Sequence, residues 1–170
     1  MRKLMRAIGR GAAAGAAGVT ALNAVTYLDM AIRARPASST PEESVRKLSE
    51  KTGMPVPGTE EEREHRIAGL GPLLGAGTGV AVGIALGLIR RSGWRPHPIA
   101  GTLAAASAAM VAGNAPMVAL GVADPRRWRV SDWISDIVPH LAYGVVAAAV
   151  LRSGAWLSIS MTRKNCGRRR

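Results

Sequence analysis

The chain alternates four apolar runs with polar and charged segments. The runs cover about residues 7–32, 67–89, 98–122 and 133–151. Each is long enough to cross a hydrocarbon core about 30 Å thick as an α-helix, which needs ~20 residues. The second and third runs contain no charged residue. The pattern predicts an all-α fold, in which residues 1–170 form a single polytopic membrane domain with four transmembrane helices.

The first run is less uniform than the others. Arg10 lies near its start and Asp29 near its end, and a basic stretch at residues 2–6 precedes it. A basic stretch before an apolar run is also typical of a secretory signal. However, no small-x-small cleavage site follows, and Asn23 and Tyr27 interrupt the end of the run. We therefore expect the first span to be retained, with cleavage as the alternative.

Small residues recur at every fourth position in the second and third runs. In lipid a helix keeps its own backbone hydrogen bonds, and glycine allows a neighbouring helix backbone to approach closely. The stripes therefore predict glycine-zipper packing, either within one chain or between copies. The predicted packing residues are Gly71, Gly75, Gly79, Gly83 and Gly87 in the second run, and Gly101, Ala105, Ala109 and Gly113 in the third.

The second and fourth runs share a sequence pattern. When Pro72 is aligned with Pro139, both runs contain I-x4-P-x-L-x2-G, and Gly77 falls on Gly144. The preceding runs also match loosely, with Asn23 against Asn114. The pattern indicates a 2+2 parallel repeat of a two-span hairpin. Chance similarity between Ala/Gly-rich helices is the alternative.

The segment at 33–66 is polar and predicts a short helical loop. Thr40 to Glu43 and Thr59 to Glu62 each have the form of a capping box. Gly53 is placed to end the first of these helices. The second helix can continue directly into the glycine-rich span. The balanced charges of the loop favour a solvated surface over a binding site.

The charges are distributed unequally between the two sides of the predicted bundle. The chain has 23 basic and 11 acidic residues, and all the acidic residues lie on the side of the long loop or at its border. The charged residues on the side that carries both termini are all basic, which predicts cytoplasmic termini in a bacterial plasma membrane. The basic tail at 158–170 is expected to contact anionic lipid headgroups. No basic stripe is interleaved with aromatic residues, so we expect no nucleic-acid partner.

Polar residues inside the spans are candidates for a site. Asn23 and Asn114 are predicted to hydrogen-bond across the bundle, or alternatively to line a polar pocket. Asp136 and His140 lie four residues apart on one helix face, and Asp132 and Asp29 are expected at a similar depth. Together these groups suit a proton or a hard cation.

Interfacial capping is the alternative for the acidic residues. Carboxylates are favoured at a helix N-terminus, and Ser131 or Asp132 is suitable as an N-cap. Cys166 is the only cysteine, which excludes an intrachain disulfide and a cysteine-based metal site.

Residues 114–144 resemble the YagU-like family of small bacterial inner-membrane proteins. The segment reads N-A-P-M-V-A-L-G-V-A-D-P-x2-W-x2-S-D-W-I-S-D-I-V-P-H-L-A-Y-G. The Gly/Ala/Arg-rich composition is also typical of a high-GC actinobacterium. The resemblance implies a membrane topology and no particular reaction. The matching residues are Pro116, Gly121, Trp128, Ser135, Asp136, His140 and Leu141.

No motif with a catalytic mechanism is present, and we expect no cofactor, no metal and no enzymatic activity. The favoured hypothesis is a non-enzymatic membrane scaffold, assembly or envelope-stress component, whose partners are the bilayer and another membrane protein or a second copy. The alternative is a small transporter or channel for protons, cations or small solutes. A membrane enzyme that uses the Asp/His cluster is a third hypothesis.

Overall fold

The computed structural model describes the backbone of residues 1–166 and the side chains of residues 1–153. Within that range it contains helices and no strand, which confirms the all-α prediction. The side chains of the predicted basic tail and of Cys166 lie outside the described residues. The helices are α1 (Arg2–Arg33), α2 (Thr40–Thr52), α3 (Glu60–Arg91), α4 (Pro98–Ala119), the 3-10 helix η1 (Pro125–Arg127) and α5 (Val130–Cys166).

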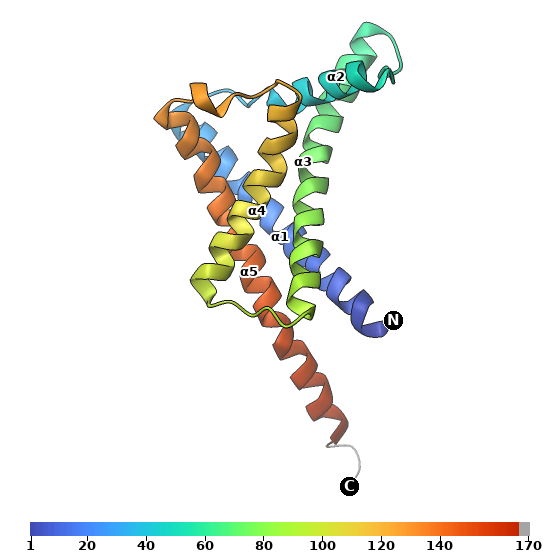
Figure 1. Ribbon diagram of the computed structural model, residues 1–170, viewed down its shortest axis with the longest axis vertical. Coiled ribbons are helices and arrows are strands. Elements are labelled where there is room, and N and C mark those ends of the chain that lie inside the picture. The colour runs from blue at the N-terminus through green and yellow to red at the C-terminus, as the bar shows by residue number, and fades with distance from the viewer. Residues whose placement is uncertain (167–170) are drawn as a thin grey trace.

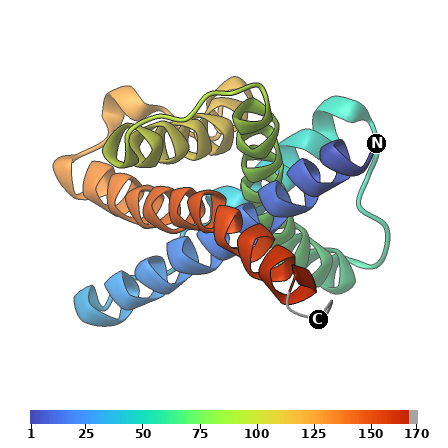
Figure 2. The same cartoon turned by 90° about the horizontal axis from the view of Figure 1, so that it is seen from below.

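The four long helices run alternately up and down (Figure 1). The start of α1 and the α3–α4 connection lie at one end of the bundle, called the basic end. The α1–α2 connection, α2 and the α4–α5 connection lie at the other, called the α2 end. Helix α1 crosses the bundle diagonally, and α4 packs on the side away from the start of α1 (Figure 2).

Three helices are long and apolar enough to cross a membrane: Glu60–Arg91, Pro98–Ala119 and the Val130–Ser153 part of α5. The chain therefore has the features of a multi-pass membrane protein. Helix α1 is not among the three, although it is 32 residues long. Arg10, Asn23 and the many glycines and alanines lower its hydropathy, so its composition does not identify the expected fourth span.

Capping explains where two of the spanning helices begin. Glu62 accepts a hydrogen bond from the Thr59 backbone at 2.9 Å, and the Thr59 hydroxyl accepts one from the Glu62 backbone at 3.4 Å. This capping box, predicted from the sequence, starts α3 at Glu60. In α5 the expected N-cap is wrong. The helix begins earlier, at Val130, and Asp132 reaches back to accept from the Arg129 backbone at 2.9 Å.

Helix α2 ends as predicted and begins differently. Gly53 closes it with φ of 67°, a left-handed conformation that glycine adopts without strain. The capping box expected at Thr40 is wrong, because Thr40 lies inside the helix and Ser39 is the N-cap. The Thr40 hydroxyl accepts instead from Ser38 at 2.8 Å. Pro41 occupies the first turn, where no backbone donor is needed.

Helices α1 and α3 pack at backbone contact distance. A β-carbon added at Gly11 would lie 2.6 Å from the Gly83 carbonyl oxygen, and one at Gly15 would lie 2.7 Å from that of Gly79. At the basic end, a β-carbon on Gly87 would lie 2.6 Å from the Ala7 carbonyl oxygen. No side chain fits between the helices at these positions. Close approach of this kind supplies van der Waals contact in lipid, where the hydrophobic effect between helices is absent.

Tyr143 of α5 fills the place where α1, α3 and α5 meet. It is fully buried, with 0% of its surface exposed, and its hydroxyl donates to the Gly79 carbonyl oxygen at 2.7 Å. A β-carbon on Gly18 of α1 would lie 2.6 Å from the Tyr143 ring. The ring therefore requires glycine at position 18 of α1, whereas in α3 it binds the backbone of Gly79. Ala14, Leu86, Ala105, Ala109, Ala147 and Leu151 form the buried apolar cluster around it.

The predicted packing residues divide into different environments. Gly79, Gly83 and Gly87 face α1, whereas Gly71 faces Pro41 of α2 and Gly75 has open space around it. The main partner of the stripe is therefore α1, which belongs to the same half of the proposed 2+2 repeat.

In α4, Ala105 and Ala109 are buried in the core cluster. A β-carbon added at Gly101 would meet one atom within 4 Å, from Pro96, and one added at Gly113 would meet one atom, from His140. The contact of α4 with α5 involves Gly144, where a β-carbon would lie 2.5 Å from the Thr102 carbonyl oxygen. Gly77, aligned with Gly144 in the sequence repeat, has nothing within 4 Å. The repeat stays a prediction.

Substitution of Gly83 by alanine tests the α1–α3 contact. The added β-carbon would lie 2.5 Å from the Cα and N atoms of Gly15, so the helices must separate. Overpacking of this kind costs about 1–3 kcal/mol, which lowers the unfolding midpoint in detergent by about 5 °C. Gly75→Ala is the matched control, because its β-carbon meets open space and alanine favours a helix. Equal midpoints for the two variants would contradict the contact.

Candidate functional site

Polar side chains gather in two places at the α2 end. The first, called the α4–α5 cluster, consists of Asn114, Asp136 and His140. The second, called the arginine pocket, lies between the end of α1 and the start of α5. It is lined by Arg33, Arg35, Arg129, Ser131, Asp132 and Ser135.

The α4–α5 cluster connects two helices within the apolar part of the chain. Asn114 of α4 donates to the Asp136 carboxylate of α5 at 2.8 Å. His140, one turn further along α5, places Nδ1 3.4 Å from the same carboxylate. The Asp136 and His140 side chains are 17% and 15% exposed. The cluster is therefore a part-buried polar contact between helices that otherwise pack through small apolar residues.

The geometry assigns roles to the two imidazole nitrogens of His140. Nδ1 lies 2.7 Å from the Asp136 backbone oxygen, and a carbonyl oxygen only accepts, so Nδ1 carries the hydrogen. In the neutral ring Nε2 is then an acceptor, and it lies on the side of Gly113 of α4. A proton taken up at Nε2 would place an imidazolium beside the Asp136 carboxylate. The cluster can therefore accept a proton without forming an unpaired charge.

The arginine pocket has a volume of about 310 Å³. Asp29 accepts from Arg33 Nη2 at 2.7 Å and from Arg35 Nε at 2.6 Å, so one carboxylate holds both guanidinium groups. Arg33 also donates to the Ser135 hydroxyl of α5. The hydrogen bond that Arg33 donates to Asp29 raises the pKa of its guanidinium above the usual value. These contacts fix the end of α1 to the first turns of α5.

The expected acidic cluster is divided between these two places. Asp29 binds arginines of its own segment, Asp132 caps the start of α5, and Asp136 faces Asn114. Among the residues with described side chains, no group of three or more His, Cys, Asp or Glu is arranged to hold a metal ion. Asn23 is exposed on α1 and does not contact Asn114. The structure thus unites Asn114, Asp136 and His140 and leaves the other candidates apart.

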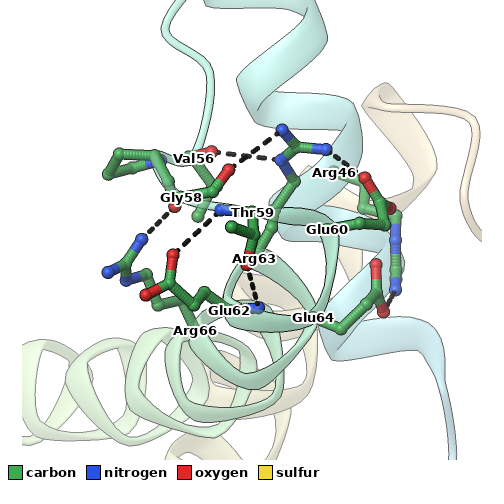
Figure 3. Close-up of polar contacts among 10 residues, drawn as sticks. Arg46, Val56, Gly58, Thr59, Glu60, Glu62, Arg63, Glu64 and Arg66 are labelled. Carbon is green, nitrogen blue, oxygen red and sulfur yellow. Dashed lines mark hydrogen bonds and ion pairs between the residues drawn. The ribbon is translucent and has the colours of Figure 1, made fainter.

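The charged residues of α2 and of the first turns of α3 bind mainly one another, as expected of a solvated surface (Figure 3). Arg46 of α2 pairs with Glu64, and Arg63 pairs with Glu60 and donates to the Val56 carbonyl oxygen. On the opposite side, Arg66 donates to the Pro57 carbonyl oxygen. Lys47 pairs with Glu50 within α2, and this hydrogen bond raises the pKa of the lysine. Of these contacts, the Arg46–Glu64 pair joins α2 to α3.

Several important residues were not identified from the sequence. Gly11 and Gly15 of α1 are four residues apart, which is the signal that marked the stripe in α3. For Tyr143 the sequence offered one indication of importance, a polar aromatic side chain in the middle of an apolar run. Arg33 and Arg35 look like ordinary flanking charges, and nothing in the sequence indicates that they meet the start of α5.

A double-mutant cycle on Asn114 and Asp136 tests the α4–α5 cluster. Either alanine substitution removes the same interhelical hydrogen bond. The two substitutions should therefore show a coupling energy of about 0.6–2 kcal/mol in unfolding experiments in detergent. Ser92→Ala combined with Asp136→Ala is the control, since Ser92 lies at the basic end and the two effects should add within about 0.5 kcal/mol. If the effects of the Asn114 and Asp136 substitutions on the free energy of unfolding also add, the contact is refuted.

Comparison with protein-family models, with curated proteins and with solved structures found no match. No relative therefore provides a substrate, a partner or a catalytic residue. The inference of function depends on the polar clusters of this chain and on the faces that its helices expose.

Proposed function

We propose that this protein is a non-enzymatic scaffold of a bacterial plasma membrane, which binds a helix of another membrane protein along the exposed face of α1. The observation that carries the proposal is the character of that face. In the middle of α1 the exposed residues are all small or polar: Ala13, Ala16, Thr20, Asn23 and Ala24. Nearer the α2 end the helix exposes the larger side chains of Tyr27, Leu28 and Ile32.

The middle parts of the other long helices differ from the middle of α1. They present large apolar side chains, such as Leu73 of α3 at 67% exposure. Such side chains suit contact with lipid. An exposed amide such as Asn23, which has no hydrogen-bond partner among the described residues, is costly in lipid and favourable against another helix. Small neighbours at Ala16 and Ala24 would let that helix approach closely.

In this proposal α1 is the fourth transmembrane crossing. It runs the full height of the bundle and packs on α3 and α5 (Figure 1). Its low hydropathy follows from contact on two sides with protein, where small residues are needed. We further propose that both termini are cytoplasmic, because the basic end has no acidic residue. The resemblance of residues 114–144 to the YagU-like family supports the same membrane, and membership of that family belongs to the proposal.

A photo-crosslinking residue at position 23 tests the scaffold function in cells. We expect a discrete crosslinked species that contains a second membrane protein, because Asn23 would face it directly. The same residue at position 73 is the matched control, since Leu73 should face lipid. A species that contains two copies of this chain would identify self-association in place of a different partner. Crosslinking only to lipid, or equally from both positions, would exclude the proposed binding face.

Cysteine labelling tests the orientation. In a Cys166→Ser background, Ser38→Cys at the α2 end should react with a membrane-impermeant maleimide in intact spheroplasts. Ser92→Cys at the basic end should react only after permeabilisation, because the basic end would be cytoplasmic. Both serines are exposed, so accessibility of the side chain does not differ between them. The reverse labelling pattern would invert the topology.

The α4–α5 cluster favours a second candidate function, proton-coupled transport. Asp136 and His140 form a part-buried acid and base pair within the apolar part of the chain. If they carry protons, reconstituted vesicles should show proton flux down an imposed pH gradient, and His140→Gln should abolish that flux. A scaffold gives no flux above that of empty vesicles at any pH.

A further inference from the structure

We propose that the arginine pocket binds the phosphate group of an anionic phospholipid. The inference is independent of the scaffold function and concerns a different surface, at the α2 end between α1 and α5. The pocket combines three arginines, two serines and one aspartate around a volume of about 310 Å³. This volume lies at the lower limit of small-ligand pockets, about 300–1,000 Å³.

The charges of the pocket leave an excess of positive charge. Its lining has Arg33, Arg35 and Arg129 against Asp132 alone, and Asp29 adjoins it. Asp132 is already engaged, because it accepts from the Arg129 backbone and from the Ser131 hydroxyl. Three cations therefore face two carboxylates, of which Asp29 pairs with Arg33 and Arg35. A ligand with one negative charge would balance the site.

The arginines retain donors for such a ligand. Each guanidinium has five N–H donors in a planar fork. Asp29 and Ser135 engage Nε and Nη2 of Arg33, while Arg35 uses Nε and Nη1 toward Asp29 and the Pro36 carbonyl oxygen. Nη1 of Arg33 and Nη2 of Arg35 therefore remain available to donate to a ligand. The Arg129 side chain makes no hydrogen bond within the described residues. Arginine forks of this kind bind phosphate oxygens in pairs.

The position of the pocket favours a lipid over a free phosphate ion. It lies where α1 ends and α5 begins, at the level where spanning helices leave the hydrocarbon core. Trp128 and Trp133 lie beside it in an edge-to-face pair, with ring centroids 5.0 Å apart. Tryptophan is enriched at the headgroup level, where its ring contacts both lipid and water. A phospholipid could place its phosphate in the pocket and its chains along the exposed apolar face of α5, which includes Ile134 and Val138.

The test measures lipid bound to the purified full-length protein by native mass spectrometry in detergent. Phosphatidylglycerol should remain bound to the wild type, and Arg129→Gln should reduce its occupancy at least fivefold. Arg126→Gln is the matched control, because it removes the same charge from a neighbouring exposed position outside the pocket. The unfolding midpoint without added lipid should be the same for both variants, which excludes misfolding as the cause.

Two further measurements distinguish a bound phospholipid from a bound phosphate ion. Inorganic phosphate at millimolar concentration should not displace the lipid, and phosphatidylcholine should bind at least fivefold less than phosphatidylglycerol. Displacement by inorganic phosphate without retention of any lipid would overturn the lipid assignment. An equal loss of phosphatidylglycerol in Arg126→Gln and Arg129→Gln would also overturn the proposal, since the attraction would then be one of general charge. If Arg129→Gln unfolds, Arg35→Lys, which keeps the charge and alters the fork, must show the fivefold loss.

Discussion

The approach of α1 to α3 without intervening side chains is the constraint on which the rest of the bundle depends. Gly11 and Gly15 meet Gly79 and Gly83 at distances that exclude even a methyl group. Because lipid solvates apolar side chains as well as protein does, this contact must be stabilised by close packing and not by the hydrophobic effect. Beside this contact, Tyr143 of α5 fills the space where α1, α3 and α5 meet.

The hydrophobic pattern predicted the elements well because lipid imposes a simple rule on length and polarity. The runs at 67–89 and 98–122 became α3 and α4 with small shifts at their ends. The first run became a helix of the expected extent, yet its composition alone does not identify a membrane span. A helix that packs on two neighbours needs small residues, and small residues contribute little hydropathy. The same small residues that let α1 pack on two neighbours therefore give it a low hydropathy.

The contacts between elements were less predictable than the elements. A stripe of glycines indicates that something approaches closely, but it does not identify the partner, so Gly71 and Gly83 were grouped together although they face α2 and α1. The polar residues show the same limit. Asn114 has the expected interhelical hydrogen bond, and its partner is Asp136 of the next helix in place of Asn23. Such pairings depend on the rotation of each helix about its axis, which single-residue spacing does not determine.

The Tyr143 hydroxyl bond to the backbone of α3 has a mechanical consequence. The ring is wedged beside Gly18 and bonded to Gly79, so α1 cannot slide or tilt along α3 without moving α5 as well. Force applied to α1 from its exposed side would therefore reach α5 within a single helical layer. The three helices are therefore expected to move together as one rigid unit around Tyr143.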